Sequence, residues 1–137
     1  MDLYNDKYIQ IKLNQDNACM EYQWKRFVPD KAFRGLLDKI YDYTVEHKCD
    51  KMLVDMEKMR VIPVESQKWV ESDWFPRMIG QGVKIFAMVM PKDKETTGSI
   101  SKKEMDAMVQ DQIKKSGVAS VTFNDLDKAK EWIAQRT

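Results

Sequence analysis

The side chains that could do chemistry are few, and they are scattered along the chain. His47 is the only histidine, and it falls beside Lys48 at the expected end of a helix. Catalysis by a Ser-His-Asp or Cys-His set would have to use this imidazole. A metal site would depend almost entirely on carboxylates. The aspartates considered for that role show no ligand spacing: Asp16, Asp30, Asp50, Asp55, Asp73 and Asp93. We therefore expect a protein that is not an enzyme and holds no metal or cofactor.

The cysteines and glycines do not form a known motif either. Cys19 and Cys49 lie 30 positions apart, which excludes the C-x-x-C spacing of redox and zinc sites, so we expect reduced structural thiols. The Gly80-Gln81-Gly82 segment precedes an apolar stretch, whereas a phosphate-binding glycine loop follows a strand and opens a helix. We interpret it as a turn that returns the chain to a sheet.

Asp55 is the most suggestive of the acidic residues, because it ends the short apolar strand expected at 51–55. An aspartate at the end of a third strand is phosphorylated in receiver domains. That class also needs an acidic pair after its first strand, and none follows Leu13 here. The structural alternative is that Asp55 caps nearby backbone amides or pairs with Arg60.

Composition indicates one globular domain spanning 1–137. Hydrophobic residues make up 43% of the chain, charged residues 33%, and the formal net charge is +1, which is typical of a folded domain. A nucleic-acid binder that relies on a broad basic face is excluded by this charge balance. No apolar stretch approaches the ~20 residues of a membrane-spanning helix. The first residues are polar rather than signal-like, so we expect a cytoplasmic protein.

Hydrophobic periodicity predicts an α/β fold. Two alternating stretches, 8–13 and 19–24, indicate an N-terminal β-hairpin. The strands expected after it are 51–55, 83–90 and 118–123, and the stretch at 83–90 is apolar enough to require cover on both faces. Helices are expected between and after these strands, with parallel strands in the βα units. The predicted element order is ββαβαβαβα in a mixed sheet, with the position of the hairpin in that sheet left open.

Cap and stripe residues place the later helices. A helix near Val64 carries an apolar stripe, Val70, Trp74 and Met78, and Pro76 should end or kink it. The next helix has a capping box formed by Ser101 and Glu104, with Gly117 as its stop. Asn124 is the expected N-cap of the last helix, which turns Leu126, Ala129, Trp132 and Ile133 toward the sheet.

Several segments together resemble the STAS, or SpoIIAA-like, superfamily, and in particular its branch of small single-domain bacterial proteins. The resemblance runs from about Tyr8 to Trp132. It is carried by the element order and by these segments: Leu53-Val54-Asp55, Trp69 with Trp74-x-Pro76, Ile85-Phe86-Ala87-Met88-Val89, and Phe123-Asn124-Asp125 followed by Ala129 and Trp132-Ile133. The fold implied is a mixed sheet of four or five strands with helices packed on it.

The resemblance also implies functions. Well-known members are anti-sigma-factor antagonists, switched by phosphorylation of a Ser or Thr just after the third strand. Here only Asp55 matches that segment, and the first hydroxyl downstream is Ser66, eleven residues further on. The expected function is thus a protein-interaction module without an evident phosphoacceptor. Other relatives bind lipids or small apolar molecules, which implies the alternative of a carrier.

The two hypotheses place their surfaces differently. The interaction module would use the connection 56–64 and the flank of Trp69 to contact a protein partner or a second copy in a homodimer. The carrier would bind its ligand outside the carboxyl ends of the parallel strands. That rim would comprise Asp55, Arg60, Lys92, Thr96, Thr97 and Asn124. An enzyme with unfamiliar catalytic residues is a third possibility.

Overall fold

A computed structural model describes residues 1–59, 62–90 and 118–136. The strands within these residues form one six-stranded sheet, and their order across the sheet is their order along the chain. The strands are β1 (Asp2–Asn5), β2 (Ile9–Asn14), β3 (Cys19–Trp24), β4 (Lys51–Asp55), β5 (Ile85–Val89) and β6 (Ala119–Phe123). The predicted α/β class and mixed sheet are therefore confirmed.

The direction of the strands changes at β3. The first three strands are antiparallel neighbours, and β3, β4, β5 and β6 run parallel. The predicted hairpin is β2–β3, and its second strand lies beside β4 with Cys19 opposite Lys51. The hairpin therefore extends the parallel sheet on the side of β4, which the sequence had left open.

The number of strands corrects the prediction of four or five. The added strand is β1, four residues long, which pairs with β2 through an irregular register between Asp2 and Tyr4. The ammonium of Met1 also donates to the carbonyl oxygen of Leu13, at 2.9 Å. A strand this short, with polar residues at both ends, has no alternation long enough to be recognised in the sequence.

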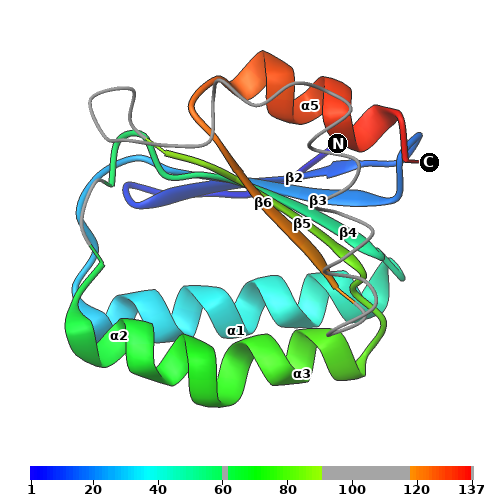
Figure 1. Cartoon of the computed structure of the whole chain (residues 1–137). Coiled ribbons are helices and arrows are strands. Elements are labelled where there is room, and N and C mark those ends of the chain that lie inside the picture. The colour runs from blue at the N-terminus through cyan, green and yellow to red at the C-terminus, as the bar shows by residue number, and fades with distance from the viewer. Residues whose placement is uncertain (60–61, 91–117, 137) are drawn as a thin grey trace.

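Helices lie on both faces of the sheet (Figure 1). On one face lies α5 (Leu126–Ala134), and on the other lie α1 (Asp30–Glu46), α2 (Val64–Trp69) and α3 (Phe75–Gly80). Parallel strands added in sequence by right-handed crossovers bring successive helices to the same face, which explains why α1 lies beside α2 and α3. None of the helices in the described ranges is long and apolar enough to span a bilayer.

The core is divided by the sheet. Met52 and Val54 of β4 belong to the larger cluster, which lies against α1, α2 and α3, while Leu53 belongs to the smaller cluster under α5. In β5, Phe86 belongs to the larger cluster and Ala87 to the smaller one. These central strands are covered on both faces, as the sequence predicted for 83–90.

The helix after β4 contains a π turn. Between α2 and α3 lies η1 (Val70–Trp74), and the N–H of Phe75 donates to the carbonyl oxygen of Val70. Of the two outcomes expected at Pro76, an end or a kink, the helix does not end there, and it contains an irregular turn directly before the proline. Its missing N–H falls directly after the π turn, where an α-helical bond to Ser72 would otherwise be required. Gly82 then takes a φ of 117°, a left-handed conformation suited to glycine, in the predicted turn before β5.

The N-cap of α5 corrects a second prediction. Asp125, rather than Asn124, caps this helix, because its carboxylate accepts hydrogen bonds from the backbone N–H groups of Asp127 and Lys128. Asn124 lies in the bend before it. The capping box at Ser101 and Glu104 and the stop at Gly117 fall outside the described residues.

Candidate ligand-binding site

An apolar cavity of about 210 Å³ lies between the sheet and the helices of the larger core cluster. Its floor is a row of side chains from three adjacent strands. Tyr22 of β3 is the register partner of Val54 in β4, which in turn pairs with Met88 in β5. Because side chains alternate between the two faces of a strand, these three partners point to the same side. Phe86, two residues before Met88, also lines the cavity.

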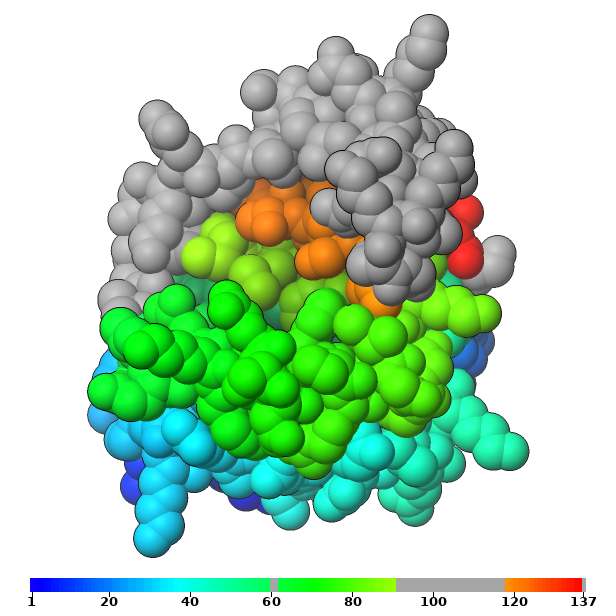
Figure 2. Space-filling model, turned by 60° about the horizontal axis from the view of Figure 1, so that its bottom comes forward, coloured from blue at the N-terminus to red at the C-terminus, as the bar shows by residue number. Residues whose placement is uncertain are grey.

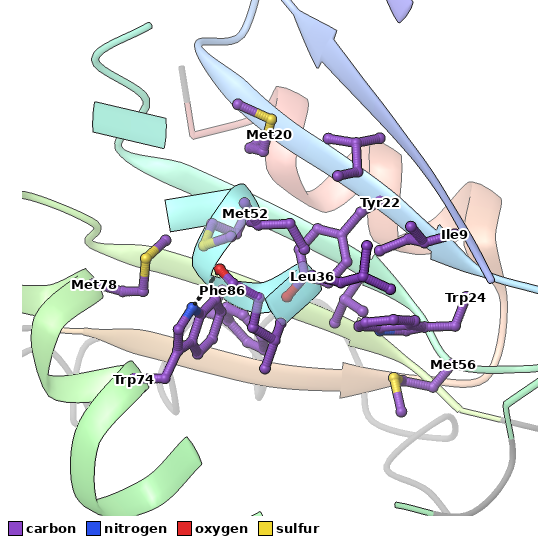
Figure 3. Packing of buried hydrophobic residues seen from close by; sticks show 14 of the residues in the cluster. Ile9, Met20, Tyr22, Trp24, Leu36, Met52, Met56, Trp74, Met78 and Phe86 are labelled. Carbon is purple, nitrogen blue, oxygen red and sulfur yellow. Dashed lines mark hydrogen bonds between the residues drawn. The ribbon is translucent and has the colours of Figure 1, made fainter. Parts of the chain in front are cut away.

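The walls of the cavity are helical. Phe33 and Leu37 of α1 face Val70 and Trp74 of η1 across it. The indole N–H of Trp74 donates to the carbonyl oxygen of Leu37 at 2.9 Å (dashed line in Figure 3). This bond is buried, and it joins the two walls directly. Figure 2 shows α2, η1 and α3 as a green ridge across this side of the molecule, with side chains of β5 and β6 visible beside it.

The π turn shapes the wall it forms. Ser66, Val70, Trp74 and Met78 follow one another at intervals of four residues. In an α-helix with 3.6 residues per turn, each such step rotates the side chain by about 40°, so the stripe would drift away from the sheet. A π turn takes more residues per turn and offsets this drift. Both Trp74 and Met78 are consequently buried.

One end of the cavity lies at the carboxyl ends of the parallel strands. Trp24 ends β3, Met56 directly follows β4, and Ile62 and Gln67 belong to the connection into α2 and its first turns. The side-chain amide of Gln67 donates to the carbonyl oxygen of Ile62 at 2.7 Å. Open α/β sheets bind ligands at this end of their strands. An apolar cavity with a few polar groups at its edge is the usual form of a small-molecule site.

Asp55 lies on the other face of the sheet. Its carboxylate is buried and accepts hydrogen bonds from the Gln23 side chain at 3.1 Å and from the backbone N–H of Glu57 at 3.0 Å. The predicted capping of backbone amides is confirmed. Arg60, its suggested ion-pair partner, is outside the described residues.

A smaller polar hollow of about 150 Å³ adjoins Asp55 beside α5. Lys12 and Lys130 line it together with Glu21, so the charges in this hollow are mixed in sign. Within 1–59, 62–90 and 118–136, no three His, Cys, Asp or Glu side chains come together as a metal site. The hollow has neither a metal-ligand set nor a uniform charge that would select one class of ligand.

Trp69 is half-buried against the larger core cluster and does not line the cavity. The guanidinium groups of Arg34 and Arg77 lie 5.4 Å and 5.8 Å from its ring centre. Arg77 also forms an ion pair with Asp38 at 2.7 Å. Trp69 thus packs between two arginines at the junction of α1 with α2, rather than forming an exposed apolar patch.

Of the remaining predicted site residues, the structure describes Asn124, which does not line the cavity. Asn124 is half-buried in the bend between β6 and α5. Lys92, Thr96 and Thr97 fall in the stretch 91–117, outside the described residues. The residues brought together by the fold are instead the aromatic and aliphatic ones that the sequence indicated only as core. Their signal was the alternation of 19–24, which places Met20, Tyr22 and Trp24 on one face of β3.

Both cysteines are free and buried, as expected of structural thiols. Burial raises the pKa of the Cys49 thiol to about 11 and raises that of Cys19 further. A thiol needs a lowered pKa to act as a nucleophile. The two cysteines therefore stay protonated at neutral pH.

No known protein-family model matches this sequence. The search of curated proteins likewise gives no match.

Proposed function

We propose that this protein is a non-enzymatic carrier or sensor that binds a small apolar molecule in the cavity between β3, β4, β5 and the helices α1 and η1. The observation that carries the proposal is the cavity itself, which is about 210 Å³ in volume, is apolar and reaches the carboxyl ends of the parallel strands. An engineered cavity of about 150 Å³ is large enough for benzene. A substituted single ring or a short branched chain would therefore fit this one.

Ligand-dependent stability tests this proposal. A molecule that binds only the folded protein raises the free energy of unfolding by about 2.7 kcal/mol at a hundred times its dissociation constant. We expect toluene to raise the melting temperature of the wild-type protein. Val70→Phe adds a ring to a half-buried residue that lines the cavity, and it should abolish this shift. The matched control is Val45→Phe on α1, because Val45 is 45% exposed and lies outside the cavity.

The outcomes separate clearly. A shift that persists in Val45→Phe and disappears in Val70→Phe supports binding in the cavity. The absence of any shift with toluene and larger apolar probes in the wild-type protein would contradict the proposal. An equal shift in all three proteins would place binding elsewhere on the molecule.

A second candidate function, the interaction module of STAS type, is supported by two exposed apolar side chains. Val64 at the start of α2 is 61% exposed, and Phe27, shortly before α1, is 51% exposed. Both lie at the same end of the molecule, since the first turns of α1 and α2 are hydrogen-bonded to each other. Membership of the STAS superfamily belongs to the same proposal and rests on the βα order and the sequential sheet.

This second candidate predicts a contact centred on Val64 rather than on Trp69. Val64→Glu should weaken any self-association or partner complex, whereas Val45→Glu on the far part of α1 should not. Sedimentation velocity of the two variants tests self-association. A monomer at all concentrations would leave a different protein as the partner, to be sought by cross-linking in cell extract with Val64→Glu as the negative control.

A further inference from the structure

The hydroxyl of Tyr22 has no hydrogen-bond partner, although the residue is only 5% exposed. No residue that the structure describes forms a hydrogen bond with this hydroxyl. Tyr22 lines the cavity, and Figure 3 shows its side chain extending from β3 toward the helix side of the sheet. The hydroxyl oxygen is not one of the fully buried unpaired atoms of the described residues, which are Nε of Arg77, Nε2 of Gln81 and Nε1 of Trp132, so it remains accessible from the cavity. A ligand in the cavity could supply the missing partner.

Two other polar groups around the cavity are already paired. The indole N–H of Trp74 is bonded to Leu37, and the side-chain amide of Gln67 is bonded to Ile62. The indole N–H of Trp24, which is 1% exposed, has no partner among the described residues, and Trp24 lines the cavity beside Tyr22. Apart from the exposed Glu71, the unpaired polar groups among the described lining residues lie on one strand, β3.

We propose that Tyr22 is the polar anchor of the cavity and that the ligand is a neutral, ring-sized molecule with one oxygen, a hydroxyl or carbonyl, that hydrogen-bonds to the Tyr22 hydroxyl. The apolar remainder of the ligand would fill the space between Val54, Met88 and Phe33. This inference rests on the proposed function, because it names the ligand class of the same cavity.

The charge of the lining residues explains why the ligand is neutral. Glu71 is the one charged side chain among the described lining residues, and no Lys or Arg accompanies it. A buried anion without a cationic partner is strongly disfavoured. Burial also raises the pKa of Tyr22 above its ordinary value, so its phenol stays protonated and can both donate and accept.

The ring shape follows from the aromatic walls. Trp24 packs edge-on against Tyr22, with 6.2 Å between ring centres, and stacks on Phe33 at 5.0 Å. Aromatic rings prefer these offset and edge-to-face arrangements with further rings. The thioethers of Met56 and Met88 add polarisable contacts that adapt to ring edges. A planar ring thus finds more favourable contacts here than an extended chain of equal volume.

The test compares p-cresol with toluene, which differ by one hydroxyl group. Dissociation constants are measured by calorimetric titration for the wild-type protein and for Tyr22→Phe. Removing the Tyr22 hydroxyl should weaken p-cresol binding about tenfold relative to toluene binding, the size expected for one hydrogen bond in a dry site. The control is Tyr8→Phe, which removes a hydroxyl outside the cavity and should leave the ratio unchanged.

Two results would overturn the inference in different ways. If Tyr22→Phe binds both compounds with an unchanged ratio, Tyr22 is not the anchor, while the cavity and the proposed function stand. If the wild-type protein binds neither compound, the proposed function fails and this inference fails with it. Nuclear Overhauser contacts in wild-type protein provide a measurement that needs no variant. The oxygen-bearing end of p-cresol should lie nearest Tyr22, and the opposite orientation would contradict the proposal.

Discussion

Ser66 donates a hydrogen bond from its hydroxyl to the carboxylate of Asp30 at 2.6 Å. Ser66 is fully buried in the first turn of α2, and Asp30 begins α1. The same carboxylate oxygen accepts from the guanidinium of Arg34 at 3.0 Å. This contact fixes the spacing of the two helices that form the walls of the cavity. It also turns the first hydroxyl after Asp55 inward, away from solvent and from any modifying enzyme.

The first prediction concerns this hydroxyl. Ser66→Ala should lower the urea midpoint of unfolding, because Asp30 loses a short charge-assisted hydrogen bond. Ser66→Asp should lower it much further, because a second carboxylate would be held against the first. Ser72→Ala and Ser72→Asp are matched controls on the exposed side of η1 and should change the midpoint little. Equal effects at positions 66 and 72 would show that the Asp30 contact is not stabilising.

The second prediction is a pH dependence at the same contact. The hydrogen bond from Ser66 and the guanidinium of Arg34 hold the pKa of the Asp30 carboxyl below its ordinary value of 3.8. The unfolded chain therefore binds this proton first as the pH falls. The stabilisation by this contact is fully present above pH 3.8 and is lost as the pH falls through the lower folded value.

Urea unfolding at several pH values measures this effect. The difference in unfolding free energy between wild type and Ser66→Ala should be largest at neutral pH and shrink as the pH falls below 3.8. The change should be modest and weaker in high salt, because Asp30 is partly exposed. A difference that grows on acidification would have the wrong sign and would exclude the carboxylate as the acceptor.

The regular elements were predictable because burial on one face imposes a period on the sequence. The alternation in β2 and β3 and the apolar stripe of α1 both arise in this way. β4, whose five residues are all buried, was recognisable as a central strand by its apolar run. β1 was not, because its pairing depends on the irregular register with β2 rather than on its own pattern.

The cavity could not be predicted from the sequence for a different reason. In the sequence, the apolar residues that line the cavity cannot be distinguished from ordinary core residues. A residue at such a position is apolar whether or not its neighbours fill the space beside it. The volume depends on how six elements meet, including a π turn whose presence the sequence signals only through Pro76 and a four-residue spacing. The sequence favoured the polar rim as a binding site because its residues carry charged, hydroxyl or amide groups. In the structure, however, Asp55 points to the face of the sheet opposite the cavity.

The third prediction tests the corrected helix cap. Asp125→Ala should lower the free energy of unfolding by about 1 kcal/mol, because two backbone N–H groups at the start of α5 lose their acceptor. Asn124→Ala is the neighbouring control and should change stability by no more than a few tenths of a kcal/mol. Chemical denaturation of the two variants distinguishes them. A larger loss of unfolding free energy from Asn124→Ala would indicate that Asn124 is the N-cap, as the sequence suggested.

The fourth prediction uses two tryptophans on opposite faces of the sheet. The Trp74 indole N–H is bonded to Leu37, whereas the buried indole N–H of Trp132, in α5, has no partner among the described residues. Replacing either tryptophan with Phe removes a similar amount of buried side-chain area. Trp74→Phe should cost about 1 kcal/mol more in unfolding free energy than Trp132→Phe, because only Trp74 loses a hydrogen bond.

The same pair of variants reports on the cavity. Trp74→Phe removes part of one wall, so the space between η1 and α1 should widen and accept a two-ring probe such as naphthalene. Trp132→Phe leaves that wall intact and should bind naphthalene no better than wild type does. Equal stability losses would mean that the bond to Leu37 contributes nothing. Equal naphthalene binding would mean that Trp74 does not limit the size of the site, and the boundary of the cavity would then have to be set by Phe33 and Phe86 instead.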